Sequence, residues 1–179
     1  QRCDEHATYN DILKRRETFT ETIDRMMTFL QEHVSETCPD ADISEQEWAE
    51  LRTAILRGEA TTSMRLMQMA GAAAQRCNVA IYNCAFVAIT DIEHFAEGLY
   101  ILMQGTGLGF SVESEFVGQL PRIKRQKKDQ QPETYVVQDS TEGWCNSLTA
   151  GLTAWFDGRD IEYDYSEVRP EGARLHTKG

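Results

Sequence analysis

Long apolar runs, an excess of basic residues and paired cysteines are all missing from this sequence of 179 residues. No stretch approaches the roughly eighteen apolar residues of a membrane-spanning helix, and no signal peptide is visible. The net charge of −11 argues against duplex DNA as a partner, because phosphate binding needs clustered Lys and Arg. The five cysteines are odd in number and include no Cys-x-x-Cys pair, which excludes a secreted disulfide framework and a zinc or thioredoxin-type motif. We therefore expect a reducing, cytoplasmic setting.

Several motifs of enzyme chemistry are absent as well. The sequence has no Gly-Lys-Ser or Gly-Lys-Thr of a Walker-type loop and no Gly-x-Ser-x-Gly elbow, and its four histidines lack metal-binding spacing. Gly105, Gly107 and Gly109 follow a predicted helix and precede a predicted strand, which is the reverse of the Rossmann order. Spacing alone favours a tight turn over an anion-binding loop for these glycines.

What the sequence does contain is helical at first. The length suits one domain or a large piece of a longer protein, and 41% hydrophobic residues suffice for a core. Apolar residues spaced by three and four predict a helix from about Arg16 to His33, with Thr18 or Thr20 as its cap. The run 44–47 reads as a capping box that opens a second helix, which Gly58 ends. A polar loop at 60–63 follows, and residues 64–75 form either a third helix or an irregular connector.

The later part of the chain alternates between strands and helices. Its predicted strands are 79–89, 110–112 and 161–165, and its predicted helices begin at Asp91 and within 139–142. A polar stretch lies between them, and its basic cluster, residues 122–128, is more consistent with a solvated loop than with a phosphate-facing one. Strands separated by helices predict an α/β architecture with parallel pairing. We expect a helical region over 1–77 and an α/β region over 78–179, with a polar loop near 122–134.

Cys84 lies within the first of these strands. Spacing alone favours an inert core thiol, with a functional thiol as the alternative. Cys77 precedes it by seven residues, so the two side chains would point to opposite faces of a continuous strand and would not form a local pair.

Five collinear segments resemble the adenosylcobalamin-dependent (class II) ribonucleoside-triphosphate reductases. They contain Asn83-Cys84-Ala85-Phe86, Gly105-Thr106-Gly107-Leu108-Gly109-Phe110-Ser111-Val112, Asp139-Ser140-Thr141-Glu142-Gly143-Trp144, Arg169-Pro170-Glu171-Gly172-Ala173-Arg174 and the helix at 16–25. The resemblance implies N-terminal helices followed by the first strands and helices of a ten-stranded α/β barrel, incomplete in this chain. It also implies a radical reaction that converts ribonucleoside triphosphates to deoxyribonucleotides with adenosylcobalamin, whose contacts would lie mainly outside these residues.

The resemblance also implies roles for individual residues. Cys84 matches one member of the cysteine pair that reduces the substrate, which implies a thioredoxin-like partner to reduce the resulting disulfide. The residues implied to bind substrate are Thr61, Ser63, Asn83, Ser111 and Val112. Those implied to bind a deoxynucleotide effector are Asp91 and Arg174, and the run 169–174 resembles the loop that couples effector identity to substrate choice. Helix caps are the alternative interpretation of Thr61 and Asp91.

Other parts of such an enzyme have no match here. The sequence ends before the region of the radical cysteine and of the partner of Cys84, so we expect these residues alone to be inactive and, with strand edges exposed, poorly soluble. Two alternatives stay open. One is a noncatalytic nucleotide-binding or assembly module of the same fold, and the other is part of a dimeric class II or class I large subunit. Neither nucleic acid nor a membrane is an expected partner.

Overall fold

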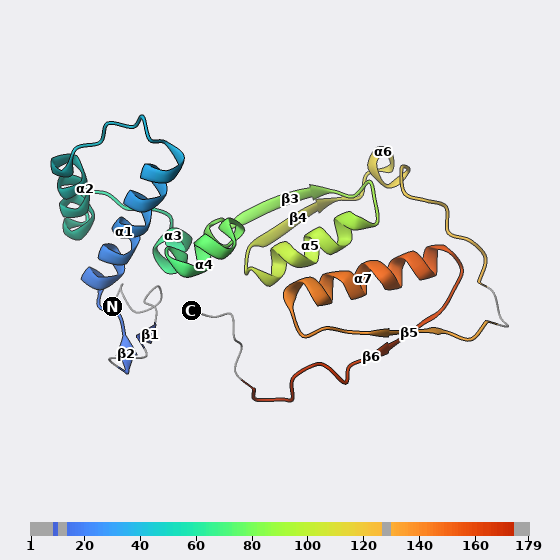
Figure 1. The fold of residues 1–179 in the computed structure, drawn as a ribbon. Coiled ribbons are helices and arrows are strands. Elements are labelled where there is room, and N and C mark those ends of the chain that lie inside the picture. Colours follow the sequence, from blue (N-terminus) through green and yellow to red (C-terminus); the bar gives the residue numbers. More distant parts are fainter. Residues whose placement is uncertain (1–8, 11–13, 127–129, 174–179) are drawn as a thin grey trace. The chain divides into compact units, whose positions relative to one another are not determined.

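A computed structural model describes residues 9–10, 14–126 and 130–173 of the chain (Figure 1). The chain divides into two compact units, of which the first ends at Asn83 and the second begins at Cys84. Among the described helices, none is both long and apolar enough to cross a membrane.

Two capped helices dominate the first unit, as the sequence predicts. Helix α1 (Phe19–Thr37) begins at Thr18, whose hydroxyl accepts the N–H of Glu21 while the Glu21 carboxylate accepts the N–H of Thr18. Helix α2 (Glu45–Arg57) begins with the same capping box at Ser44 and ends at Gly58, which has a φ of +73°. The cap spacing in the sequence therefore fixes both helix starts. A short antiparallel pair, β1 (Tyr9–Asn10) and β2 (Arg15–Arg16), precedes them and was not predicted.

The connector at 64–75 is two short helices rather than one. Helices α3 (Met64–Met69) and α4 (Ala72–Arg76) are separated at Gly71, whose φ of +101° suits glycine. Arg25 of α1 fastens this region by donating to the carbonyl oxygens of Met67 and Ala70, at 2.9 and 2.5 Å. Its guanidinium also pairs with Glu17 at 2.9 Å. Around it lies the buried core of the unit, formed by Ile23, Met26, Met27, Phe29, Ile55, Met67, Ala70 and Ala74.

The strand predicted over 79–89 is wrong in its first half. A 3₁₀ helix, η1 (Asn78–Ile81), occupies that part, because the N–H groups of Ala80 and Tyr82 bond back to the carbonyls three residues earlier. The strand itself, β3, is Cys84–Ala88. Cys77 and Cys84 therefore do not share a continuous strand, so the prediction that their side chains point to opposite faces of one strand is wrong.

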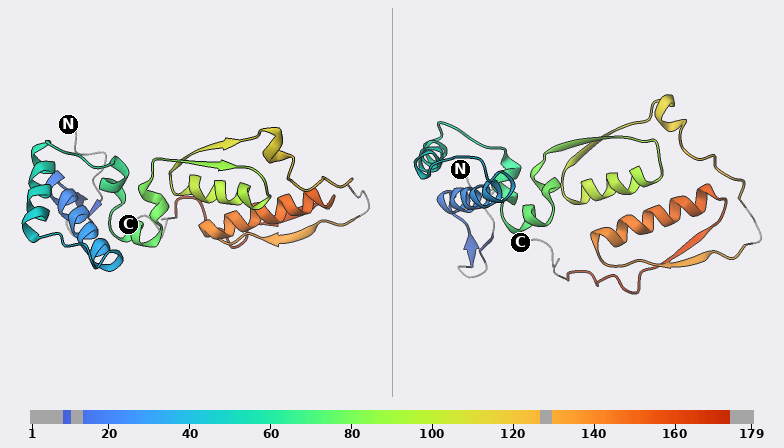
Figure 2. Two further views of the ribbon diagram at one scale, coloured as in Figure 1. Left: turned by 90° about the horizontal axis from the view of Figure 1, so that it is seen from above. Right: turned by 45° about the horizontal axis from the view of Figure 1, so that its top comes forward.

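The second unit consists of two strand–helix–strand units. In the first, β3 pairs in parallel with β4 (Gly107–Ser111) and α5 (Glu93–Met103) connects them. In the second, β5 (Glu133–Val136) pairs in parallel with β6 (Ile161–Asp164) and α7 (Thr141–Phe156) connects them. The two helices lie side by side between the strand pairs, and a single helical turn, α6 (Ser114–Val117), follows β4 (Figures 1 and 2).

The observed fold confirms a mixed α/β architecture with N-terminal helices and parallel strand pairs. The predicted barrel is not seen in the part of the chain that the structure describes, where both parallel sheets have two strands. Closing a barrel needs many more strands in continuous register. Strand β5 was not predicted, and β4 starts at Gly107 rather than at Phe110.

Two predicted boundaries also need correction. Asp91 was expected to cap the next helix, but the residue before α5 is Ile92, and the Asp91 carboxylate accepts the N–H of Glu93 at 3.4 Å. The polar loop predicted near 122–134 is attached at its start to the end of α7, because the N–H of Lys124 donates to the carbonyl of Phe156 at 2.8 Å. Within the basic cluster, residues 122–126 are exposed, while Lys127 and Lys128 lie outside the described residues.

Candidate functional site

Cys84 is the first residue of β3, and its thiol is free and exposed. The interpretation from spacing alone, an inert thiol in the core, is therefore wrong about burial. In the parallel register Cys84 pairs with Gly107, and Phe86 pairs with Gly109 two positions further along. Strands β3 and β4 are thus paired over their whole length, and the thiol lies at the amino-terminal end of the pair.

Helix α5 covers part of one face of the strand pair, where Phe110 is still 63% exposed, and the other face is open around Cys84 and Phe86. Helix α5 packs against the covered face, where Val87 is buried and Leu108 lies so close to Gly98 that a Cβ there would stand 2.9 Å from the leucine methyl group. Side chains alternate along a strand, so Cys84 and Phe86 point to the opposite face. Phe86 is 67% exposed on that face.

Two glycines of β4 leave the open face without side chains beside Cys84 and Phe86. Gly105 has a φ of +82° and makes the turn after α5, as the sequence indicates. Gly107 and Gly109, however, are strand residues rather than part of that turn. A Cβ at Gly109 would lie 3.7 Å from the Phe86 ring. The open face therefore presents bare backbone beside Cys84 and Phe86, which lets a ligand approach the main chain closely.

Ser111 and Val112 lie at the other end of this pair. Ser111 is the last residue of β4, pairs with Ala88, and is buried, with its hydroxyl accepting the N–H of Glu113 at 3.4 Å. Ser111 lies four positions after Gly107, which is paired with Cys84, and this corresponds to about 13 Å along the strand. Val112 follows the strand and is exposed. The structure thus places Ser111 on the same strand pair as Cys84, at the opposite end from the thiol, and Val112 directly after the pair.

Asp91 belongs to a tight turn after β3. The ring Nδ1 of His94 accepts the N–H groups of Thr90 and Asp91, each at 3.2 Å, and so fixes the turn. Because the Asp91 carboxylate accepts the N–H of Glu93, its observed contact is with the helix start. His94 is thereby a partner-bonded histidine. The predicted effector role of Asp91 stays a prediction, and Arg174 lies outside the described residues.

Thr61, Ser63 and Asn83 belong to the first unit. Ser63, not Thr61, caps a helix, since its hydroxyl accepts the N–H of Leu66 at 3.1 Å. Thr61 is exposed and donates to the carbonyl of Thr62 at 3.2 Å, so the cap interpretation of Thr61 is wrong. Asn83 is exposed. The structure brings Thr61 and Ser63 together in one loop, where the hydroxyl of Thr62 reaches the sulfur of buried Met26 at 3.2 Å.

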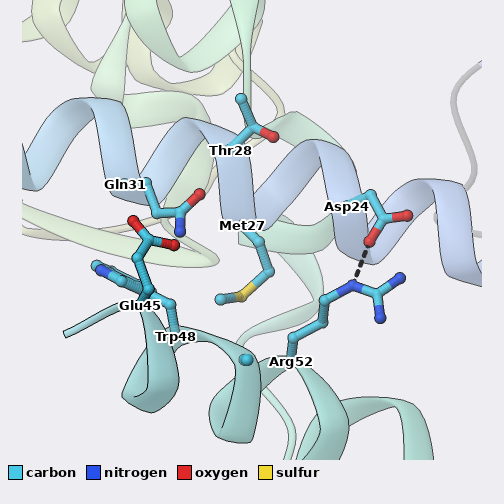
Figure 3. A pocket seen from close by; sticks show the side chains of 8 residues that line it. Asp24, Met27, Thr28, Gln31, Glu45, Trp48 and Arg52 are labelled. Carbon is cyan, nitrogen blue, oxygen red and sulfur yellow. Dashed lines mark hydrogen bonds and ion pairs between the residues drawn. The ribbon is translucent and has the colours of Figure 1, made fainter. Parts of the chain in front are cut away.

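A pocket of about 310 Å³ lies between α1 and α2 (Figure 3). Met27 and Trp48 form its apolar wall, and Asp24 and Arg52 form an ion pair of 2.5 Å at its edge. None of the predicted site residues lines it. It contains no thiol, so it is not a candidate for reductive chemistry.

The described residues do not fit a cobalamin site. Within ranges 9–10, 14–126 and 130–173, no group of three or more His, Cys, Asp or Glu side chains gathers as metal ligands do. The pocket between α1 and α2 has a volume at the lower end of that for drug-sized ligands, and a corrinoid is far larger. No catalytic step through cobalamin is therefore assigned to these residues.

Sequence reasoning did not single out Phe86 as a neighbour of Cys84 on the open face. Its ring is the largest exposed side chain on the face that carries Cys84. The signal was present, because Phe86 follows Cys84 at the two-residue period of a strand and so shares its face.

Comparison with known proteins points to one kind of enzyme. The chain is 35% identical over 103 residues to an adenosylcobalamin-dependent ribonucleoside-triphosphate reductase of Euglena gracilis. It is 33% identical over 118 residues to a probable reductase of the same description from Dictyostelium discoideum. Each match covers 56% of this chain but only 14% and 16%, respectively, of the relative, so the chain corresponds to a small part of these proteins. No family model and no solved structure matches. Over rather more than half of its length, the chain is similar to adenosylcobalamin-dependent ribonucleoside-triphosphate reductases.

Proposed function

We propose that this chain is part of a ribonucleoside-triphosphate reductase and that Cys84 is one of the two cysteines that reduce the substrate. The observation that carries the proposal is the 35% identity over 103 residues to the Euglena gracilis reductase. The exposed thiol at the start of a parallel strand supports the role of Cys84, because a redox thiol must reach both its substrate and a second thiol. A strand holds such a group more rigidly than a loop does.

The reaction at Cys84 is a two-electron reduction at the ribose C2′ position. The bond between C2′ and its hydroxyl oxygen breaks, the oxygen leaves as water, and hydrogen takes its place on C2′. Cys84 and a second cysteine supply the electrons and are oxidised together to a disulfide. A thioredoxin-like dithiol then reduces this disulfide by thiol exchange. The resemblance implies that the second cysteine lies in another part of the full-length protein, and Cys145, the free thiol on α7, is buried.

The remaining predicted residues have supporting roles in this proposal. Thr61 and Ser63 offer a hydroxyl and backbone N–H groups to the substrate phosphates, and Asn83 lies next to the reducing thiol in the chain. Ser111 and Val112 also bind the substrate. Asp91 and Arg174 contact the deoxynucleotide effector. Adenosylcobalamin supplies the initiating radical in enzymes of this kind, through contacts with other parts of the full-length protein.

The proposal is tested on the full-length reductase. Replacing Cys84 with Ser should lower dithiol-dependent multiple turnover by at least about a hundredfold, because the variant cannot form the disulfide. Cys38→Ser is the matched control, since Cys38 is also a free, exposed thiol but lies at the end of α1. Full turnover by Cys84→Ser would show that the assigned role is wrong.

The alternatives give different results in the same assay. A noncatalytic module would bind a nucleotide without turnover even in the wild-type protein. A class I large subunit would turn over without added adenosylcobalamin once its own radical source is supplied. Only a cobalamin-dependent reductase loses turnover when the cobalamin is left out.

A further inference from the structure

The motif Asp139-Ser140-Thr141-Glu142-Gly143-Trp144 forms the start of α7, and its function is not explained by helix capping alone. Ser140 is the cap, with its hydroxyl accepting the N–H of Gly143 at 2.9 Å. Gly143 has no side chain because a Cβ there would overlap the carbonyl of Gln138. Ser140 and Gly143 thus form the tight start of the helix. The side chains of Asp139 and Trp144 take no part in it and contact other residues.

Asp139 contacts Arg169 twice. Its carboxylate pairs with the Arg169 guanidinium at 3.2 Å and accepts the Arg169 backbone N–H at 3.4 Å. The two side chains are only 20% and 30% exposed, so this is the least solvated ion pair of the second unit among those that the described residues form. A contact to the side chain and the main chain of the same residue fixes the position of the backbone there.

Trp144 makes the second contact, with Tyr165. The two rings stack with their centroids 6.1 Å apart and their planes 28° from parallel. Tyr163 lies at a similar distance from Tyr165, 6.1 Å between centroids. Aromatic pairs of this kind stabilise a fold beyond the area that they bury. The segment that leaves β6 is therefore held at its start as well as at Arg169.

The segment between and beyond these contacts consists of two turns. The N–H of Val168 donates to the carbonyl of Tyr165 at 2.9 Å, and the N–H of Ala173 donates to the carbonyl of Pro170 at 3.2 Å. Arg169 lies between the two turns, so its contact with Asp139 sets the direction in which the second turn projects. This second turn, residues 170–173, is exposed throughout, and Gly172 supplies its φ of +82°.

We infer that Asp139 and Trp144 are positioning residues that hold the segment Tyr165–Ala173 and thereby set the selectivity of the enzyme among substrate bases. The selectivity part rests on the proposed function, since resemblance implies that this segment couples effector identity to substrate choice. The contacts themselves stand on geometry and are independent of any activity. Asp139 acts through Arg169, and Trp144 acts through Tyr165.

The contacts are tested by hydrogen–deuterium exchange of the protein. Asp139→Ala should speed exchange in the peptide that contains residues 166–173 by about tenfold, because the Arg169 N–H loses its acceptor. The matched control is Asp157→Ala, which breaks a 2.8 Å pair with Lys124 in the same unit and should leave this peptide unchanged. Unchanged exchange in Asp139→Ala would overturn the proposed contact.

Selectivity is tested on the full-length reductase with two ribonucleoside triphosphates that differ in their base. The effector-induced change in the ratio of their kcat/KM values should fall several-fold in Asp139→Ala and in Trp144→Ala, and Trp144→Phe, which keeps an aromatic ring, should restore most of it. Faster exchange with an unchanged ratio would overturn the role in selectivity and leave the contact standing. A wild-type protein without reductase activity would overturn the proposed function and the selectivity role together, while exchange still decides the contact.

Discussion

The hydroxyl of Tyr163 on β6 lies directly against Gly151 in the middle of α7, and it donates a hydrogen bond of 3.0 Å to the carbonyl of Ser147. A Cβ at position 151 would overlap this hydroxyl. Replacing Gly151 with Ala should therefore destabilise the fold by about 1–3 kcal/mol through overpacking, although alanine favours helices. The free energy of unfolding, measured with denaturant, checks this value.

A double-mutant cycle shows whether the overlap is the cause. Tyr163→Phe removes the hydroxyl and makes room for the added methyl group, so the double variant should be more stable than the sum of the two single changes predicts. Gly109→Ala is a control on β4, where the new Cβ would meet only ordinary contacts at 3.7 Å or more. Additive effects of Gly151→Ala and Tyr163→Phe would contradict the interpretation.

Arg25 joins α1 to the end of α3, and its removal should be costly. Arg25→Met removes the cation that pairs with the Glu17 carboxylate, which is 12% exposed and also accepts the Thr22 hydroxyl, and it frees the carbonyls of Met67 and Ala70. We expect a loss of about 2–4 kcal/mol in the free energy of unfolding. Arg52→Met is the matched control, because its pair with Asp24 is well exposed and should contribute little. Equal losses in the two variants would count against the bridging role.

The cap of α1 should make stability depend on pH. The Arg15 guanidinium, followed by the backbone N–H and the hydroxyl of Thr18, lowers the pKa of Glu21 from 4.5 to about 2. Because the folded pKa is below the unfolded one, the stabilisation is complete above pH 4.5 and is lost as the pH falls towards 2. Unfolding followed across this window should show a smaller acid-induced loss in Glu21→Gln. An acid-induced loss as large in Glu21→Gln as in the wild type would contradict this role of the cap.

The thiols on the two strand–helix–strand units should differ in reactivity. Cys84 is exposed, whereas Cys145 on α7 is 8% exposed, and burial, helped by the charge of Glu142, raises the pKa of its thiol. Since the thiolate is the nucleophile, alkylation of the native protein should modify Cys84 at least about tenfold faster than Cys145. Peptide mapping at short reaction times gives the two rates separately. In denaturant the rates should converge, and a difference that persisted there would show that burial is not the cause.

The sequence predicts the capped helices well because a cap is a local structure. Thr18 with Glu21 and Ser44 with Glu47 satisfy helix amides within four residues, so no distant contact is needed to fix the helix starts. The strand predicted over 79–89 fails for a related reason. Val79, Ala80 and Ile81 have the apolar character of a strand, but their backbone bonds close a 3₁₀ turn that buries Ala80. An apolar run does not distinguish these two structures.

The candidate site was only partly predictable. Resemblance singled out Cys84, but its exposure depends on which face of β3 is covered by α5, and this follows from packing rather than from local sequence. The contact between Asp139 and Arg169 joins residues that are thirty positions apart, so no local pattern predicts it. Strand β5 begins directly after Pro132 and has four residues, which is too short for a clear alternation.

The parallel pairing of β5 with β6 has a consequence for the order of folding. Glu133 pairs with Ile161, so the whole intervening chain, which includes α7, must fold back before the first bond between these strands can close. Closing such a loop costs chain entropy that the local contacts of α1 and α2 do not require. The capped helices should therefore form early, and the register of β5 on β6 should be among the last features of the second unit to become fixed.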